Sequence, residues 1–195
     1  MQALGRKGLL DRSIVIVTAD HGEAFGEHGR MLHTSTPYEE TIHVPLVVRF
    51  PPRFGRLPAR WSGIVELRDL VPTICDALGL GCRVNAERSL LRLVRSGAGD
   101  GRVARAWTSD GNGVALGALT DGHKLVMDSR AHRLELYELS RDPGEERDLS
   151  FVRCALARRL ARRLQGNRQE AALATASHPV ADDIRRKLRA LGYTR

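Results

Sequence analysis

The sequence feature that most constrains the fold is a short apolar run, Ile14 to Ala19, that leads directly into Asp20, His21 and Gly22. β-Branched residues dominate this run, as they do in strands that are buried on both faces of a sheet. The glycine lets the backbone turn immediately after the strand. The run therefore predicts a buried strand that carries a carboxylate and an imidazole at its carboxyl end.

These two side chains suggest a metal site. Asp20 offers a hard oxygen ligand and His21 a borderline nitrogen ligand, and a turn that aims both at one point would let them bind a single divalent cation. An Asp-His pair taken alone is more often a cap followed by a surface histidine. The metal interpretation therefore depends on what surrounds the pair.

Length and composition are those of one soluble globular domain. The chain has 195 residues, of which 42% are hydrophobic and 28% charged, enough to bury a core. No apolar run approaches the roughly 20 residues that cross a bilayer, and the segment 1–10 lacks the apolar core of a signal peptide. We expect a soluble chain with neither a signal peptide nor a transmembrane segment, and the compartment stays unassigned.

The net charge of +8 is confined to the end of the chain. Residues 1–150 hold 20 basic and 20 acidic side chains, whereas residues 151–195 hold 11 and 3. This distribution does not favour a nucleic-acid partner. One alternative remains, a non-catalytic fragment whose tail binds an anionic partner. The residues involved would be Arg158, Arg159, Arg162, Arg163 and the segment 185–189.

The three cysteines are Cys75, Cys82 and Cys154. Their number is odd and their spacing fits no zinc site. We therefore expect ordinary thiols, without a disulfide framework.

The first half of the chain predicts strands and helices around an acidic, histidine-bearing loop, residues 20–40, which we call the acidic loop. Tyr38 to Ile42 can form a helical turn, and Val44 to Phe50 reads as a second strand closed by prolines. Apolar residues recur at helical spacing from Ile64 to Leu78, with Asp69 as a cap and Gly79 as a stop. Residues 83–102 read as a connecting loop.

The second half predicts a small antiparallel sheet followed by helices. The four strand candidates are Val103–Thr108, Val114–Thr120, Lys124–Met127 and Arg133–Leu139. Asp121-Gly122 and Ser129-Arg130 supply turns between them. Ser150 can cap a helix whose apolar stripe is Val152, Leu156, Leu160 and Leu164. A last helix is expected from about Pro179 to Leu191.

Several motifs occur in an order that resembles the sulfatase branch of the alkaline-phosphatase superfamily. They are T-A-D-H-G-E at 18–23, G-E-H-G at 26–29, His33 five residues before Y-E-E, and H-V-P-L-V-V at 43–48. The resemblance continues through Leu67–Leu80, Arg88–Gly97, Asp121–Met127 and Leu134–Leu149, and so covers about residues 1–165.

The resemblance implies roles for individual residues. Asp20 and His21 would be metal ligands, and His33 would be the catalytic, substrate-binding residue that contacts the sulfate or phosphate oxygens. His28 and His43 read as structural, Glu23, Glu39 and Glu40 as residues that tether the loop, and Lys124 and Tyr137 as structural parts of the sheet.

The sequence also departs from the family pattern. The family's nucleophile is a cysteine or serine, converted to formylglycine, in a C/S-x-P-x-R motif, and none of the three cysteines stands in one. The early acidic metal ligands are missing too. We therefore expect a C-terminal fragment without a nucleophile, inactive alone, with formylglycine in the missing N-terminal half.

The metal and the reaction each leave alternatives. The metal would be calcium, or manganese or zinc given the nitrogen of His21. The expected substrate is a small-molecule or glycan sulfate ester. A phosphodiesterase or phosphoglycerol transferase of the same superfamily is the enzymatic alternative.

The expected fold class is α/β, a truncated alkaline-phosphatase-like sheet with flanking helices, followed by a small antiparallel sheet and C-terminal helices. Residues 1–82 would be the distal part of the catalytic domain and 83–102 a connecting loop. Residues 103–165 would form the small sheet with a helix, and 166–195 a basic tail with a short helix.

Overall fold

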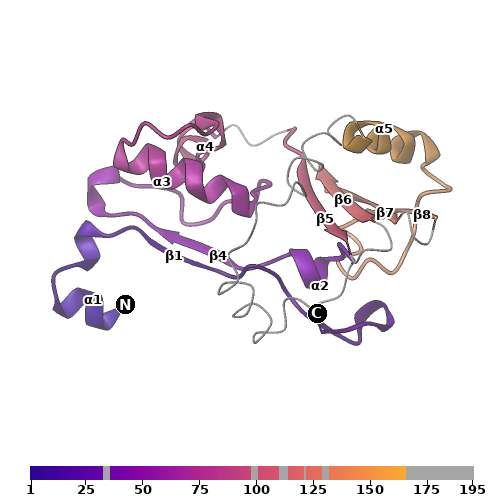
Figure 1. Ribbon diagram of the computed structural model, residues 1–195, viewed down its shortest axis with the longest axis horizontal. Helices are drawn as coiled ribbons and strands as arrows, with labels where there is room; N and C mark the ends of the chain where they lie inside the picture. The colour runs from indigo at the N-terminus through magenta and orange to yellow at the C-terminus, as the bar shows by residue number, and fades with distance from the viewer. Residues whose placement is uncertain (33–35, 98–100, 110–113, 121, 129–131, 166–195) are drawn as a thin grey trace, which may run out of the picture.

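The chain folds into two lobes that lie side by side along its longest axis (Figure 1). The structure is a computed structural model that describes residues 1–32, 36–97, 101–109, 114–120, 122–128 and 132–165. The N-terminal lobe contains a two-stranded ladder with helices α3 (Leu70–Leu78) and α4 (Leu90–Ser96). The C-terminal lobe contains a four-stranded sheet with helix α5 (Cys154–Gln165). Short elements of the chain are α1 (Gln2–Arg6), η1 (Leu10–Arg12), β2 (Ala24–Phe25), η2 (Glu27–Gly29), β3 (Met31–Leu32) and η3 (Pro52–Phe54).

The ladder of the N-terminal lobe pairs β1 (Val15–Thr18) with β4 (Leu46–Arg49) in antiparallel register. Val17 lies opposite Val47, so the two side chains share a face of the ladder. They are 58% and 61% exposed. Both predicted strands exist, but the expectation that the first is buried on both faces is wrong for the described chain, because a ladder of only two strands leaves this face open.

Helices α3 (Leu70–Leu78) and α4 (Leu90–Ser96) pack against each other above the ladder in Figure 1. The expectation of a plain loop over residues 83–102 is wrong here. Ser89 caps α4 by accepting a hydrogen bond from the Arg92 amide, and Gly97 ends it with φ 70°. The buried side chains of Leu90, Leu91 and Leu93 then hold the helix in place. The turn η5 (Ala86–Arg88) precedes it.

Asp69 ends the turn η4 (Leu67–Asp69) that leads into α3. Its side chain does not cap α3 as predicted, but accepts a hydrogen bond from the Glu66 amide at 2.9 Å. The carboxylate is fully buried and lies 2.5 Å from Arg88 and 2.7 Å from Arg102. The buried charge is therefore paired, and it links three separate segments of the lobe.

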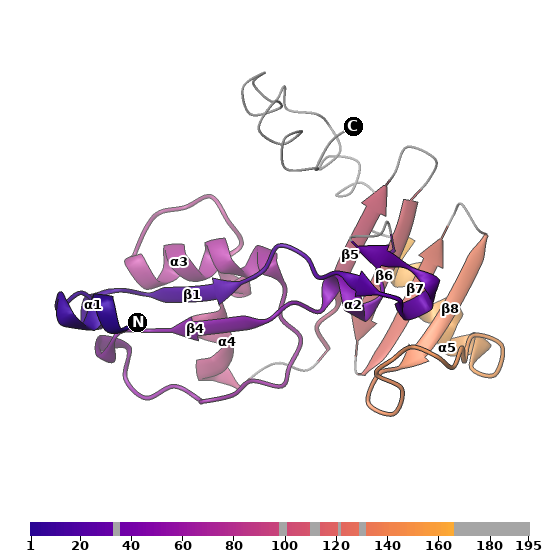
Figure 2. The ribbon, with the colours of Figure 1, turned by 90° about the horizontal axis from the view of Figure 1, so that it is seen from below.

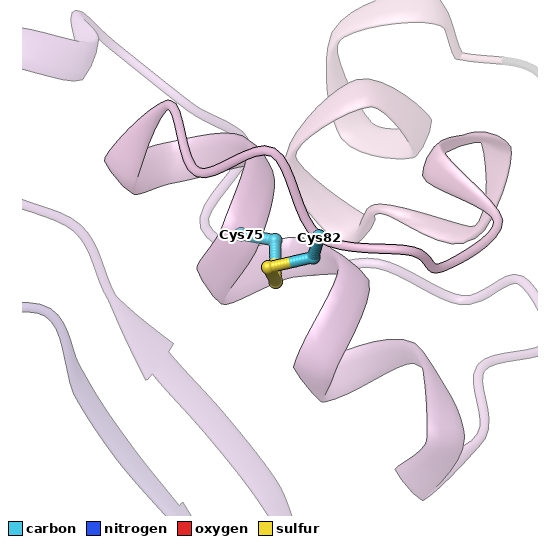
Figure 3. The surroundings of a disulfide bond; sticks show 2 residues. All are labelled: Cys75 and Cys82. Carbon is cyan, nitrogen blue, oxygen red and sulfur yellow. A yellow bond between two sulfur atoms is a disulfide. The ribbon is translucent and has the colours of Figure 1, made fainter.

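A disulfide joins Cys75 and Cys82 (Figure 3). The expectation of free thiols is wrong for these two residues. Helix α3 ends at Leu78, and Gly79 takes a left-handed conformation with φ 65° that reverses the chain. The reversal leaves the two Cα atoms 6.0 Å apart, within the range that a disulfide spans. Cys154 is free and exposed.

The C-terminal lobe contains the predicted antiparallel sheet. Its strands follow each other in sequence order, and all pairs are antiparallel: β5 (Ala104–Ser109), β6 (Val114–Thr120), β7 (His123–Asp128) and β8 (Arg133–Glu138). Gly122 has φ 74° at the turn from β6 to β7, which a glycine adopts without strain. Asp121 and the predicted Ser129-Arg130 turn lie outside the described residues.

Both faces of this sheet are covered. Successive side chains of a strand point to opposite faces, so neighbouring residues pack against different elements. Leu125 lies opposite Leu136, and both pack under helix α5 (Cys154–Gln165). Val126 and Tyr137 point the other way, against Tyr38 from the acidic loop segment. Figure 2 shows α2 (Glu39–Ile42) and the β2–β3 hairpin on this side of the sheet and α5 on the other.

Helix α5 differs from the predicted helix at its start. It begins at Cys154, so Val152 lies outside the apolar stripe and is 82% exposed. Ser150 does not cap it, since its hydroxyl donates to Asp148 at 2.9 Å. The buried stripe is Ala157, Leu160 and Leu164, and the arginines at 158, 159, 162 and 163 are exposed.

The predicted last helix lies outside the described residues. Across the part of the chain that the structure describes, no helix has the length and apolar character needed to span a membrane.

Candidate functional site

The predicted metal pair lies just beyond the end of β1. The amide of His21 donates to Asp20 Oδ1 at 3.1 Å, and His21 Nε2 lies 3.9 Å from Asp20 Oδ2. The Asp20 side chain is 72% exposed and that of His21 33%. His33, the third predicted site residue, lies outside the described residues. The structure therefore brings together two of the three side chains.

The donor atoms of the pair fit a divalent cation. His21 Nδ1 lies 2.9 Å from the carbonyl oxygen of Gly22, a contact in which Nδ1 donates, so the acceptor lone pair is on Nε2. Metal–ligand bonds of about 2.0–2.6 Å let one ion contact both Nε2 and the Asp20 carboxylate across their present separation. Within the described ranges no group of three or more His, Cys, Asp or Glu side chains could hold a metal. Asp20 and His21 would thus supply part of a coordination shell.

Gly22 holds the turn against helix α2 (Glu39–Ile42). Its amide donates to the carbonyl oxygen of Thr41 at 2.9 Å. A Cβ atom at this position would lie 2.1 Å from the carbonyl oxygen of Glu40, far inside van der Waals contact. Only glycine permits this approach, so the Asp20-His21 turn packs directly against α2.

Helix α2 in turn rests on a buried ion cluster from the C-terminal lobe. Lys124 on β7 is 0% exposed, and its Nζ lies 2.9 Å from Glu39 Oε1 and 2.8 Å from Glu145 Oε1. Glu145 Oε2 accepts a hydrogen bond from the Glu39 amide, the first of α2, at 2.6 Å. Burial raises the pKa of Glu145, although the ammonium of Lys124 opposes the shift.

The sequence identified Glu39 and Glu40 as tethers and Lys124 as structural, and both descriptions fit these contacts. The sequence did not reveal that Glu145 joins them. Glu145 lies within the Leu134–Leu149 segment that carries the family resemblance, but a segment match does not show which side chains meet in the fold.

His28 lies in a structural turn with φ 50°. Its ring stacks on Tyr38 with centroids 3.8 Å apart. Nδ1 lies 3.0 Å from Glu40 Oε1, and Nε2 lies 3.2 Å from the carbonyl oxygen of Glu145. Since both ring nitrogens and one ring face are engaged, His28 ties the loop to both α2 and the C-terminal lobe. His43, exposed after α2, pairs with Glu39 at 3.2 Å.

Two tyrosines complete the contact with the sheet. Tyr38 Oη donates to Glu135 Oε2 at 2.7 Å, and its ring meets Tyr137 edge-on. Burial raises the pKa of both phenols above their ordinary value. A hollow of about 240 Å³ borders this contact and is lined in part by His28, Tyr38 and Glu135. Its described lining includes neither Asp20 nor His21.

Comparison with known proteins identifies a family. The family model described as Sulfatase matches residues 1–80. Arylsulfatase K of Mus musculus is 30% identical over 156 residues, which are 73% of this chain and 28% of that protein. The Delta 4,5-hexuronate-2-O-sulfatase of Bacteroides thetaiotaomicron is 27% identical over 148 residues, 71% of this chain and 30% of that protein. The chain thus spans less than a third of the length of these relatives.

Solved structures share the fold. A 2-O GAG sulfatase superposes with a TM-score of 0.66 at 21% identity, over 90% of this chain and 39% of that one. The superposition includes both lobes in large part, so the arrangement of ladder, α2 and antiparallel sheet resembles part of a sulfatase. Sequence and fold agree, and the chain belongs to the sulfatase family of the alkaline-phosphatase superfamily.

Proposed function

We propose that this chain is the distal, C-terminal part of a hydrolase that cleaves sulfuric esters. In the complete enzyme Asp20 and His21 would hold a divalent cation, and His33 would contact the transferred sulfo group. The observation that carries the proposal is the Asp20-His21 turn at the end of β1, held against α2 through Gly22, in a chain of the sulfatase family.

The chemistry follows from these positions. When bound, the cation would offset the negative charge on the sulfo oxygens and so polarise the sulfur. Asp20 would contribute a carboxylate oxygen and His21 its Nε2. The contact of His21 Nδ1 with the Gly22 carbonyl oxygen sets the tautomer of the imidazole. A positively charged or hydrogen-bonding His33 would stabilise charge on the oxygen that leaves.

The nucleophile must come from residues that precede this sequence in the complete enzyme. Cys75 and Cys82 are bonded to each other, and Cys154 lies exposed at the start of α5, in the opposite lobe from β1. None stands in the nucleophile motif of the family, whose cysteine or serine becomes formylglycine. The chain alone is therefore expected to bind metal weakly and to turn over no ester.

An open apolar surface on the N-terminal lobe supports a larger parent domain. Val17 and Val47 on the ladder and Val71, Ile74 and Leu78 on α3 are all substantially exposed. A two-stranded ladder is marginally stable in water, and an apolar surface of this kind is normally covered. Further strands from the missing part of the α/β sheet would cover it.

The substrate class follows from the relatives. One of them is named for 2-O-sulfate removal from an unsaturated hexuronate, so a sulfated sugar is the proposed substrate. A phosphodiesterase or phosphoglycerol transferase remains the enzymatic alternative, because sequences that place a histidine after the metal-binding aspartate occur in both groups. The two differ in the nucleophile, a formylglycine precursor for the sulfatase and a threonine for the transferase.

The test uses a longer protein in which the missing region precedes residue 1. It should hydrolyse p-nitrophenyl sulfate, and Asp20→Ala should lower the rate at least about 100-fold, because the cation supplies several kcal/mol of charge stabilisation. Asp11→Ala is the matched control, since Asp11 is equally exposed at 73% and pairs with Arg49 at the far end of the ladder. Its rate should stay near that of the unmodified protein.

Three outcomes would count against the proposal. Retained activity in Asp20→Ala refutes the metal assignment. Hydrolysis of bis(p-nitrophenyl) phosphate without hydrolysis of the sulfate favours the phosphodiesterase. Salt-sensitive binding of the 195-residue chain to heparin, lost when residues 151–195 are deleted and without any esterase activity in the longer protein, favours the anion-binding fragment.

A further inference from the structure

The buried ammonium of Lys124 lies where the two lobes meet at the acidic loop. It is 0% exposed and lies within 2.9 Å of two carboxylates, Glu39 at the start of α2 and Glu145 after β8. A buried lysine is costly unless it is paired. The strands around it could bury an apolar residue instead, as β7 does at Leu125 and Val126. The buried charge of Lys124 therefore needs an explanation, and the segment that it fixes in place supplies one.

What it holds is α2. This helix has four residues, too few to be stable through its own hydrogen bonds. Its amino end is fixed by the Glu145 carboxylate, which accepts from the Glu39 amide at 2.6 Å, and by the Glu39 side chain on Lys124. Both carboxylates pair with the same ammonium, so removing it leaves the buried Glu145 carboxylate facing the partly buried Glu39 carboxylate.

The carboxyl half of α2 then touches the Asp20-His21 turn. The Gly22 amide donates to Thr41 at 2.9 Å, and Gly22 fits only because it has no Cβ beside Glu40. Asp20 and His21 have no regular strand or helix of their own beyond the end of β1. A shift of α2 would therefore move the turn with it.

We propose that Lys124 is a positioning residue for the metal-binding turn. Through Glu39 and Glu145 it fixes α2, and α2 fixes Gly22 and with it the relative placement of the Asp20 and His21 donor atoms. The C-terminal lobe thereby takes part in building the site. The inference rests on the proposed function only in calling this turn a metal site, because the mechanical link stands without it.

The test measures hydrogen exchange of the Gly22 amide in the full 195-residue chain by NMR. Lys124→Met keeps the length of the side chain and removes the charge. Exchange at Gly22 should become about tenfold faster or more, because hydrogen bonds to charged groups no longer hold α2. Glu39→Gln keeps an oxygen that can accept from Lys124, and its effect should be smaller and in the same direction.

The matched control is Leu160→Ala, which removes a fully buried side chain from the α5 side of the same sheet. It should lower the melting temperature of the lobe and leave exchange at Gly22 unchanged under native conditions. Equal acceleration in Leu160→Ala, or no acceleration in Lys124→Met and Glu39→Gln, overturns the proposal. If Lys124→Met does not fold, Glu39→Gln against Leu160→Ala decides.

A second readout separates this inference from the proposed function. Mn²⁺ titration followed by water-proton relaxation should show weak binding that Asp20→Ala removes and Lys124→Met weakens. Binding that Asp20→Ala leaves unchanged would refute the metal site, while faster exchange at Gly22 would still support the role of Lys124. If Asp20→Ala removes Mn²⁺ binding but Lys124→Met leaves exchange at Gly22 unchanged, the metal site is supported and the role of Lys124 is refuted.

Discussion

The sheets of the two lobes bury their apolar residues to very different degrees. In the C-terminal lobe Leu125, Leu136 and Leu160 are each at most 1% exposed, whereas the facing pair Val17 and Val47 of the N-terminal ladder is more than half exposed. Both lobes are built from short antiparallel strands and helices, so the element types do not explain the contrast. The number of strands does: four strands covered on both faces complete a core, and two strands do not.

The contrast shows which part of the chain folds on its own contacts. In the C-terminal lobe the sheet packs on α5 with one face and on the acidic loop segment with the other. The N-terminal lobe adds two links to the packing of α3 on α4, the ion pairs of buried Asp69 with two arginines and the covalent bond between Cys75 and Cys82. The candidate site lies where the two lobes meet, and its placement depends on contacts from both lobes.

The largest expected effect compares one residue from each lobe. Leu160→Ala should lower the free energy of unfolding by about 2–5 kcal/mol, because it opens a cavity in a closed core. Val47→Ala should change it by less than about 0.5 kcal/mol, since the side chain is already exposed. Unfolding in guanidinium, followed by tryptophan fluorescence, measures both free-energy changes. Trp107 reports on the C-terminal lobe and Trp61 on the N-terminal lobe, each in a chain whose other tryptophan is replaced by phenylalanine.

A large cost for Val47→Ala would break the comparison. It would mean that the ladder face is covered in solution by a second copy of the chain. Sedimentation at several protein concentrations would then show an oligomer, and the cost would fall on dilution.

The next effect concerns the disulfide of the N-terminal lobe. Replacing Cys75 and Cys82 by serine should cost about 2–3 kcal/mol, the entropy of closing a short loop in the unfolded chain, here one with a sequence separation of 7. The loss should appear in the Trp61 transition and leave the Trp107 transition in place. Before reduction, alkylation and mass spectrometry should label Cys154 alone, and labelling of three thiols would contradict the bond.

The smallest effect is a dependence on acid in the N-terminal lobe. Asp76 is partly buried, which works against its charge, but hydrogen bonds from Arg92 and Ser89 outweigh burial and lower its pKa below the usual 3.8. A carboxylate whose pKa is lower in the folded state than in the unfolded state stabilises the fold above pH 3.8, and this contribution is lost as pH falls through the folded pKa.

Asp76→Asn should remove that dependence. Unfolding of the N-terminal lobe at a series of pH values below 4 should show a steeper loss of stability in the unmodified chain than in the variant. Parallel curves would show that Asp76 has the same pKa in both states.

Much of the local structure could be predicted from the sequence. Turn residues and alternation located the four strands of the C-terminal sheet, and the helical spacing and Gly79 located α3. The errors arose where a local signal had two readings. Leu90 to Val94 read as loop because glycines follow it, yet Ser89 and Gly97 are the caps of a helix. The position of Asp69 predicted a helix cap, yet its side chain pairs with the partly buried Arg88 and Arg102.

The candidate site divides in the same way. The sequence by itself determined that Asp20 and His21 follow a strand and that Gly22 turns the chain, because strand, turn and neighbouring donors are properties of adjacent residues. Its ordered motifs also determined the family. Only the tertiary structure decided what holds the turn, since Lys124 and Glu39 are 85 residues apart and His28 and Glu145 are 117 apart. The same holds for the bond between Cys75 and Cys82, because a pairing requires the chain reversal at Gly79, and no local pattern encodes the distance between two side chains that the fold brings together.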